Sequence, residues 1–310
     1  LVRGVADDSA TWFTRSRKPG TPTWAAEISN GNGAPVVGFV DTARFLADAQ
    51  GQVPAIAQCA SQLQLAGNLG RVGIALSGDP QVTRARFSVD VGALAPRIAS
   101  SALAVPEGFA KAVAQAPLAV QWNLDLAAVR ARLDPCMRLF DVDLGAVEQI
   151  GIRAGRAFVR TFDADEREGT GALSLDLAHK RFLADKLDDI PLRSTLERKR
   201  TFGPYAGKSL SIPMFLSVDY VLQDQLALAG VGDGLLLAMI GSGGSVPGPL
   251  AELAVQPLGL SVESWTALFE LAEIHNANAV ATQLQRWREV RVNLAIEGTR
   301  LVLAASGTRR

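Results

Sequence analysis

An internal duplication constrains this chain more than any other feature of its sequence. Four groups of residues recur in the same order, at separations of 84, 77, 78 and 86 residues, so that small insertions align two copies of one unit. The matched groups are Asp41 with Asp125, Cys59 with Cys136, Val72-Gly73-Ile74 with Ile150-Gly151-Ile152, and residues 87–91 with residues 173–177. One match could arise by chance, whereas four matches in order favour duplication.

Each copy is expected to begin with a strand, continue through helical segments and end in further strands. The strand before Asp41 and the one before Asp125 both lead into helical stretches, which these carboxylates can cap. Turn residues at 77–80 separate two strands in the first copy. Strands are expected at 35–41, 71–76 and 82–91 in the first copy and at 118–125, 150–154, 157–162 and 171–177 in the second.

A fainter third copy is expected near the end of the chain. Residues 226–240 resemble an opening hairpin that turns at Gly232-Asp233-Gly234, and residues 264–288 carry apolar side chains at helical spacing. A closing hairpin is expected at 289–306, with its turn at Glu297-Gly298-Thr299. Before this copy, residues 201–223 are expected to form strands that turn at 205–208.

The pattern predicts an α+β protein of internally repeated units, each with antiparallel strands and helices packed on one face. Phe87 and Val89 alternate with Ser88 and Asp90, as in a half-buried strand with one wet face. Three segments follow: residues 1–105 as the first repeat with an N-terminal hairpin, 106–195 as the second repeat, and 196–310 as strands with a divergent third repeat.

Composition narrows the classes of partner. Basic and acidic residues balance at 31 each, which argues against a nucleic-acid partner, and the one basic cluster, residues 198–200, is expected in a solvated loop or helix end. No run reaches the roughly 18 apolar residues of a membrane helix, so we expect no transmembrane segment. Because the chain begins at Leu1 rather than Met, we expect a processed chain or a fragment, with any signal peptide or lipid anchor missing.

The two cysteines are the most informative candidate site. Cys59 and Cys136 occupy equivalent positions in the two copies and could form a disulfide in an exported protein, although two separately buried thiols fit equally well. Neither His179 nor His275 lies in a catalytic motif, and the glycine-rich segments lack the residues of a phosphate-binding loop. The acidic stretch 163–169 is expected to be a hairpin tip rather than a calcium loop. We therefore nominate no catalytic residue, no cofactor and no metal ligand.

The repeated strand-Asp-helix unit, with "VGIALSGD" and "QIGIRAG" as its later strands, resembles a group of uncharacterised bacterial cell-envelope proteins. These are secreted or lipoprotein-type proteins built from duplicated α+β units. The resemblance implies export to the bacterial periplasm or cell surface and supplies no catalytic residues.

Two functions of different classes fit these observations. The first is a non-enzymatic cell-envelope protein that binds a protein partner or organises an assembly. The second is a periplasmic carrier that holds a lipid or other apolar ligand between sheet and helices, suggested by apolar segments such as residues 235–240. A hydrolase with a carboxylate pair is a third and weaker reading.

Overall fold

The structure is a computed structural model, and it describes 12 parts of the chain. These are residues 36–40, 72–92, 95, 105–106, 109, 115–123, 151–190, 196–212, 216–232, 234–240, 245–246 and 249–310. The helices expected after Asp41 and Asp125, and both cysteines, lie outside the described residues.

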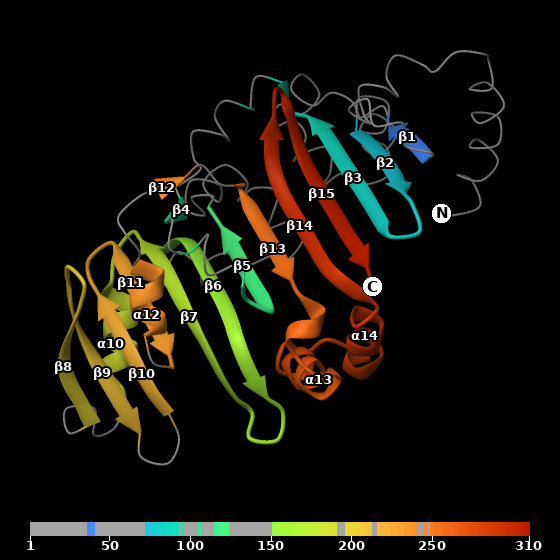
Figure 1. Cartoon of the computed structure of the whole chain (residues 1–310). Helices are drawn as coiled ribbons and strands as arrows, with labels where there is room; N and C mark the ends of the chain where they lie inside the picture. The colour runs from blue at the N-terminus through green and yellow to red at the C-terminus, as the bar shows by residue number, and fades with distance from the viewer. Residues whose placement is uncertain are drawn as a thin grey trace, which may run out of the picture.

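Thirteen strands form one antiparallel sheet in the order β1-β2-β3-β15-β14-β13-β5-β6-β7-β11-β10-β9-β8, and Figure 1 shows them side by side from β8 at the left to β1 at the upper right. Two short strands, β4 and β12, pair separately. The strands are β1 Val36–Val40, β2 Val72–Gly78, β3 Val82–Asp90, β4 Val105–Pro106, β5 Leu118–Trp122, β6 Ile152–Asp163, β7 Glu168–Leu177, β8 Glu197–Phe202, β9 Tyr205–Ile212, β10 Leu216–Leu222, β11 Leu226–Val231, β12 Ser245–Val246, β13 Ala251–Val255, β14 Trp287–Glu297 and β15 Arg300–Arg309. Within the described ranges the helices are α10 Arg181–Asp188, α12 Leu235–Ile240, η3 Pro257–Gly259, α13 Val262–Leu271 and α14 Ala277–Leu284.

One strand topology occurs three times in this sheet. In β1-β2-β3, β5-β6-β7 and β13-β14-β15, a short strand pairs antiparallel with the first strand of a hairpin. The connection before each hairpin has a similar length, namely 31 residues (41–71), 29 residues (123–151) and 31 residues (256–286). The third unit therefore starts at β13 and not at residue 226. Duplication itself remains a hypothesis, which this shared topology favours.

Side chains that pair across neighbouring strands lie on the same face of the sheet, which defines two faces. One row of paired residues crosses six strands from β2 to β5, and a second row runs parallel to it. The first row is Leu76, Ala85, Ala305, Val292, Leu253 and Val120; the second is Ile74, Phe87, Leu303, Leu294, Ala251 and Trp122. We call the side that carries these rows the α14 face and the opposite side the α12 face.

The expected α+β fold with helices on one face is wrong. A single antiparallel sheet dominates the described residues, and helices lie against both of its faces. On the α12 face, Leu236 of α12 packs with Phe202, Val221 and Leu228. On the α14 face, Trp265 of α13 and Ala281 of α14 pack against the lower ends of β13, β5 and β14. Figure 1 shows α12 in front of β11, and α13 with α14 below β13 and β14.

The helical pair α13–α14 is anchored by one tryptophan. Trp265 is 0% exposed and its indole nitrogen donates to the Pro257 carbonyl oxygen at 2.8 Å. Ser261 is the N-cap of α13, and its hydroxyl accepts a hydrogen bond from the Ser264 backbone nitrogen at 3.1 Å. The side-chain amide of Gln285 also donates to the Pro257 carbonyl, at 2.7 Å, which fixes the end of α14 beside η3.

Three other expectations are corrected. Residues 226–240 form strand β11 followed by helix α12, not a hairpin, because the apolar run after Gly234 has no strand partner in the sheet and packs as a helix. Residues 264–288 form two helices and the start of β14, since Glu273 and Asn276 take positive φ and end the helical path. Residues 205–208 begin strand β9, and the turn lies before them at Gly203, whose φ is +55°.

Two hairpins are confirmed and the basic cluster is relocated. Gly298, with φ +61°, turns β14 into β15, and residues 164–167 join β6 to β7, so the acidic stretch is a hairpin tip. The basic residues 198–200 lie in β8, a strand at the edge of the sheet, and not in a loop or helix end. Charged side chains on an edge strand discourage pairing with another chain, so this cluster has a structural explanation.

Candidate functional site

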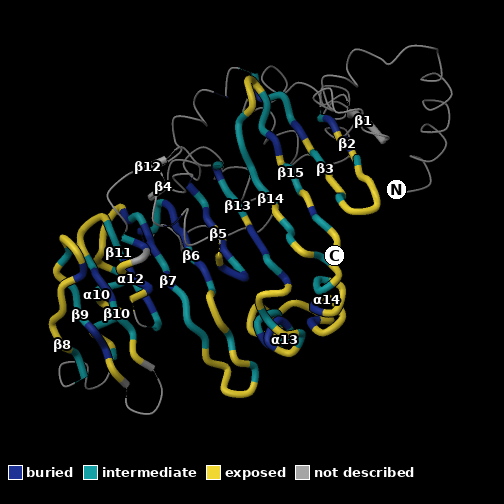
Figure 2. The backbone as a smooth tube through the Cα atoms, in the orientation of Figure 1, coloured by how far each residue is buried: buried dark blue, intermediate teal, exposed yellow. Residues whose placement is uncertain are grey.

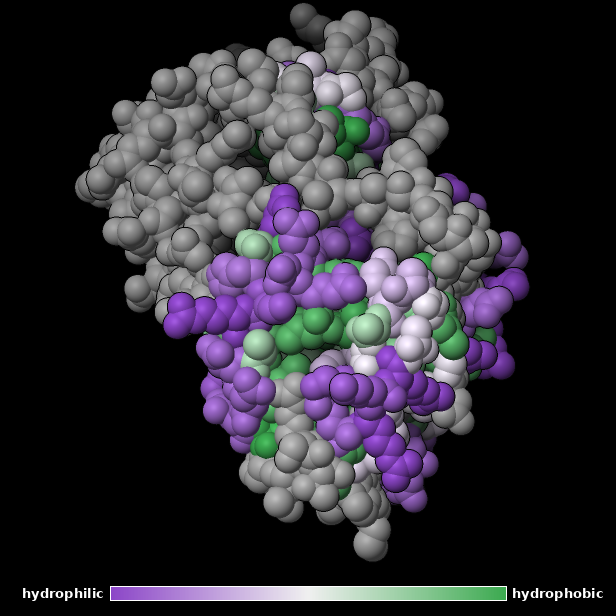
Figure 3. Space-filling model, turned by 90° about the vertical axis from the view of Figure 1, so that its left-hand side faces the viewer, coloured by the Kyte–Doolittle hydropathy of each residue, from purple (hydrophilic) through white to green (hydrophobic). Residues whose placement is uncertain are grey.

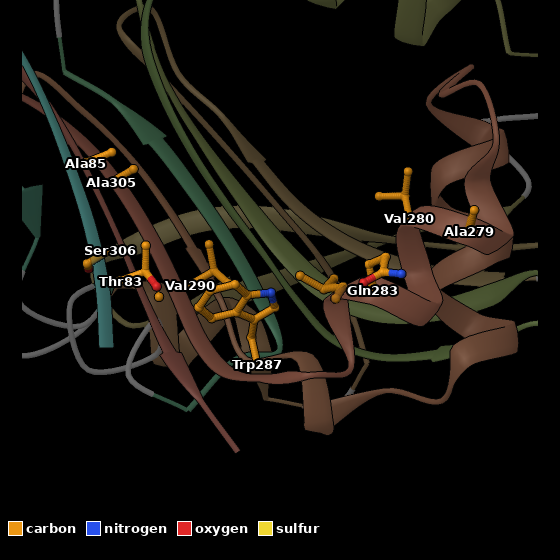
Figure 4. A pocket seen from close by; sticks show the side chains of 11 residues that line it. Thr83, Ala85, Ala279, Val280, Gln283, Trp287, Val290, Ala305 and Ser306 are labelled. Atoms are coloured by element: carbon orange, nitrogen blue, oxygen red, sulfur yellow. The ribbon is translucent and has the colours of Figure 1, made fainter. Parts of the chain in front are cut away.

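An apolar pocket opens between helix α14 and the α14 face of the sheet. Its volume is about 560 Å³, within the range of small-molecule sites. Figure 4 shows side chains from β3, β15 and β14 on one side of the opening and side chains from α14 on the other. The lining residues are Thr83, Ala85, Ala279, Val280, Gln283, Leu284, Trp287, Val290, Ala305, Ser306 and Gly307.

Small residues create the pocket floor. Ala85 pairs directly with Ala305, and Thr83 pairs with Gly307, so short side chains stand where longer ones would meet α14. Gly307 is required for a second reason: a Cβ there would lie 2.7 Å from ring carbons of Trp287. The indole of Trp287 therefore lies over the glycine of the neighbouring strand and forms a flat apolar wall.

Helix α14 supplies the opposite wall. Its buried side is fixed to the core through Ala281, which is fully buried beside Trp265. Val280 is the preceding residue of the chain, and it points toward the opening instead of the core (Figure 4). The wall is therefore held in place by one side of the helix while the other side remains available to a ligand.

The pocket continues into a wider apolar surface. Along β2, β3, β15, β14, β13 and β5, the α14 face carries apolar side chains or glycine except at Thr83 and Arg309. Six apolar side chains of this face are between 37% and 43% exposed: Ile74, Leu76, Phe87, Leu303, Leu253 and Val120. Figure 2 shows buried positions alternating with more exposed ones along these strands. On the side of the molecule where β8 lies in Figure 1, Figure 3 shows further apolar side chains in a recess bordered by hydrophilic ones. Contiguous exposed apolar surface of this kind marks binding sites.

The α12 face carries polar side chains that pair with one another. Arg156, 1% exposed, forms an ion pair with Asp176 at 3.0 Å. The side-chain amide of Gln121 donates to Glu252 at 2.5 Å, and the Asn123 amide donates to the Pro249 carbonyl at 2.8 Å. Buried polar groups are tolerated when they are hydrogen-bonded, so this network is structural.

The polar side chains of the pocket lining can form hydrogen bonds to a ligand. These side chains are Thr83, Gln283 and Ser306, which can orient a ligand but do not titrate near neutral pH. His179 is exposed after β7, and His275 is exposed in the turn between α13 and α14, so neither lies in the pocket lining. Within the described residues, no three His, Cys, Asp or Glu side chains are grouped so as to hold a metal ion.

Two carboxylates near this region have lowered pKa values. Hydrogen bonds from the Gln81 and Val82 backbone nitrogens lower the pKa of Asp79 in the β2–β3 turn. A hydrogen bond from its own backbone nitrogen, followed by one from Ser261, lowers the pKa of Glu263 in the first turn of α13. Both carboxylates are exposed and stabilise local backbone, so they are not candidates for acid–base work.

The apolar segment that the sequence offered for a ligand does not line the pocket. Residues 235–240 form α12, where Leu235, Leu236 and Met239 are buried in the core. The pocket residues were missed because Ala85, Ala305 and Gly307 carry no motif. The one available signal was the apolar alternation of β14 followed by the apolar run 301–305 of β15, with small residues at 304–307.

Comparisons with known proteins add little to the site. Neither the protein-family models nor the curated proteins contain a match to this chain. Two solved structures, crystal forms I and IV of TP0453, are similar at 11% and 9% sequence identity, with TM-scores of 0.30 and 0.29. The alignments cover 67% of this chain and 94% of the first structure, and 62% and 89% for the second. Likeness at these scores carries no argument about fold or function.

No helix among the described residues is both long and apolar enough to cross a membrane.

Proposed function

We propose that this protein is a carrier that binds a lipid or another apolar ligand in the pocket between α14 and the sheet. One observation carries the proposal: a pocket of about 560 Å³ with an almost wholly apolar lining opens onto an exposed apolar sheet face. A folded protein has no reason to keep such a surface in water unless something covers it for part of its cycle.

The energetics favour a ligand with a hydrocarbon chain. Each methylene group transferred from water to an apolar surface contributes about 0.8 kcal/mol, which corresponds to roughly a fourfold gain in affinity. The floor at Ala85 and Ala305 is flat and has no charged group, so a flexible chain can lie along it. The hydroxyl of Thr83 and the amide of Gln283 offer few polar contacts, so the pocket suits an apolar ligand better than a polar ligand.

Binding of neutral alcohols tests this proposal. N-phenyl-1-naphthylamine is a neutral apolar dye, and its fluorescence should increase when it binds. 1-Alkanols with chains of about eight to sixteen carbons should displace it. We expect the displacing affinity to rise by about fourfold per methylene until the pocket is filled. Absence of dye binding, or affinity independent of chain length, would contradict the proposal.

A matched pair of variants in α14 localises the site. Val280→Asp places a charge in the lining, whereas Thr282→Asp places the same charge on the exposed part of the same helix outside the lining. We expect Val280→Asp to weaken dye binding by at least about tenfold and Thr282→Asp to leave it unchanged, because only the first charge must be desolvated. Equal effects would place the ligand elsewhere.

A protein partner on the exposed apolar row is the second candidate. The side chains that favour it are Phe87 and Leu253, which lie on the α14 face away from the pocket lining and are exposed. A photo-crosslinking amino acid at Phe87 should then capture a protein from a cell-envelope extract, and the same label at the exposed Thr282 should not. Capture of lipid alone would support the carrier.

Export to the periplasm or cell surface forms part of the proposal, since a carrier of a water-insoluble ligand acts between membranes through water. The resemblance to envelope proteins supports it. The two cysteines offer the test, because a disulfide between Cys59 and Cys136 persists only in an oxidising compartment. Blocked thiols in non-reduced protein from the native cell support export, and two freely labelled thiols would remove this support.

A further inference from the structure

Arginine residues gather at the end of the pocket where Trp287 lies. Residues 285–291 and 307–310 contain five arginines and one glutamate, in a chain whose charges balance overall. These two segments are neighbours, because Trp287 pairs with Arg309 across β14 and β15, and the Arg310 backbone nitrogen donates to the Arg286 carbonyl oxygen at 3.2 Å. The local charge is therefore strongly positive beside an apolar pocket.

Acidic groups beside this cluster are already engaged, including Glu252, which forms an ion pair with Arg291 at 3.7 Å. Glu289 accepts a hydrogen bond from Arg291 at 2.5 Å, and the side chain of Asp79, in the turn beside the end of β15, accepts two backbone hydrogen bonds. Arg286, Arg288 and Arg309 are exposed and form no ion pair with another described residue. Three guanidinium groups thus remain able to bind an external anion.

Arg309 lies directly at the pocket. It is on the α14 face, two residues beyond Gly307, and its guanidinium carbon is 5.2 Å from the centre of the Trp287 ring. Trp287 is itself a pocket wall. One indole therefore lines the apolar pocket and also lies beside a cation.

We infer that the ligand of this pocket is an anionic amphiphile, with its hydrocarbon chain along Ala85 and Ala305 and its carboxylate or phosphate bound by Arg286, Arg288 and Arg309. The inference rests on the proposed apolar-ligand function and names the ligand class. Guanidinium groups suit both anions, because their planar donors match carboxylate and phosphate oxygens. Charge complementarity sets the orientation of the ligand, head group outward at Trp287 and chain inward under α14.

Three probes with the same chain of about sixteen carbons test the inference. A chain of about this length suits a small-molecule pocket of this volume. They are hexadecanoate, hexadecyl phosphate and the neutral hexadecanol. The affinity of each is measured by displacement of N-phenyl-1-naphthylamine, at probe concentrations below the aggregation limit of that probe. We expect one or both anions to bind about tenfold tighter than the alcohol at low salt, with the preference falling as salt is raised. The relative affinities of hexadecanoate and hexadecyl phosphate then identify the head group.

A charge-matched pair of variants locates the anion site. Arg288→Gln with Arg309→Gln removes two charges next to Trp287, one on the adjacent residue of the chain and one across the strand pair, and Arg198→Gln with Lys199→Gln removes two exposed charges on the edge strand β8. We expect the first double variant to lose the preference for anions while it keeps its affinity for hexadecanol. The second should retain the preference.

Each outcome separates the two proposals. Equal binding of acid and alcohol by the unchanged protein overturns the anionic head group and leaves the apolar carrier standing. Binding of none of the probes overturns both. Loss of the preference in the β8 variant as well shows a general charge effect and overturns the assigned site. If the pocket variant is unfolded by circular dichroism, the salt dependence of the unchanged protein decides, because a preference that does not fall with salt contradicts binding by arginine.

Discussion

The α12 face and the α14 face of the sheet use the same strands but differ in what they bury. On the α12 face Val302 is 0% exposed, and polar residues such as Arg156 are buried in paired networks. On the α14 face the adjacent residue, Leu303, is 43% exposed although its neighbours are apolar. The more polar face is the more buried one. This difference teaches that the strands bury one face more completely than the other, and our proposal assigns the less buried face to a ligand.

The largest expected effect comes from removing the anchor of the α14 wall. Trp265→Ala deletes a fully buried indole and its hydrogen bond to Pro257, and we expect it to lower the free energy of unfolding by about 3–5 kcal/mol. The dye-binding pocket should be lost with it. Leu271→Ala, at the exposed end of the same helix, is the control and should change stability by under about 0.5 kcal/mol. Urea unfolding measures both.

A pair of neighbouring substitutions on β15 tests the comparison itself. Val302→Ala should cost about 2 kcal/mol of unfolding free energy, because it leaves a cavity in the α12 face. Leu303→Ala should cost less than about 1 kcal/mol because the side chain is half exposed. Affinity for long-chain ligands should show the opposite order, with only Leu303→Ala weakening it. If Leu303→Ala were the more destabilising change, the α14 face would be core and the ligand proposal would fail.

The N-cap of α13 gives a smaller effect. Ser261→Ala removes the hydrogen bond that the Ser264 backbone nitrogen donates, and we expect a loss of about 1 kcal/mol in unfolding free energy. Ser261→Asp retains an acceptor at the cap and should keep the stability of the unchanged protein. A loss of the same size in both variants would mean that the hydroxyl acts through another contact.

The smallest effect is a pH dependence at the β2–β3 turn. The backbone hydrogen bonds hold the pKa of Asp79 below its ordinary value of 3.8, so the folded state favours the carboxylate. Its stabilisation is complete above the unfolded pKa and is lost as the pH falls through the lower, folded pKa. The stability difference between the unchanged protein and Asp79→Asn should therefore shrink between pH 6 and pH 3, about the window that acid titration of a carboxylate covers. If this stability difference grew on acidification, the folded state would raise the pKa of Asp79 instead of lowering it.

Local chemistry explains which elements could be predicted. The β14–β15 hairpin follows from Gly298, which takes a positive φ at the turn, and the β2–β3 turn follows from Asp79, whose side chain accepts from the residues after it. Both depend only on residues next to one another. The apolar run 235–240 was misassigned because a short apolar segment fits a strand and a buried helix equally well.

The pocket could not be predicted, since its parts come from distant segments. Ala85 meets Ala305 only because β3 pairs with β15, and Val280 faces them only because the turn at Asn276 returns α14 over the sheet. Neither pairing leaves a mark in the local sequence. The same is true of the arginine cluster, in which Arg309 reaches Trp287 through strand pairing.

The sequence by itself determined the strand alternation, the β2–β3 turn and the β6–β7 and β14–β15 hairpins, because these depend on neighbouring residues and on a period of two. Tertiary structure decided the order of the strands in the sheet, the face that each helix covers and hence the position of the pocket. The physical reason is that an apolar side chain such as Leu303 or Val302 has no preference for one partner over another. Only the assembled sheet fixes that Val302 is buried and Leu303 is exposed.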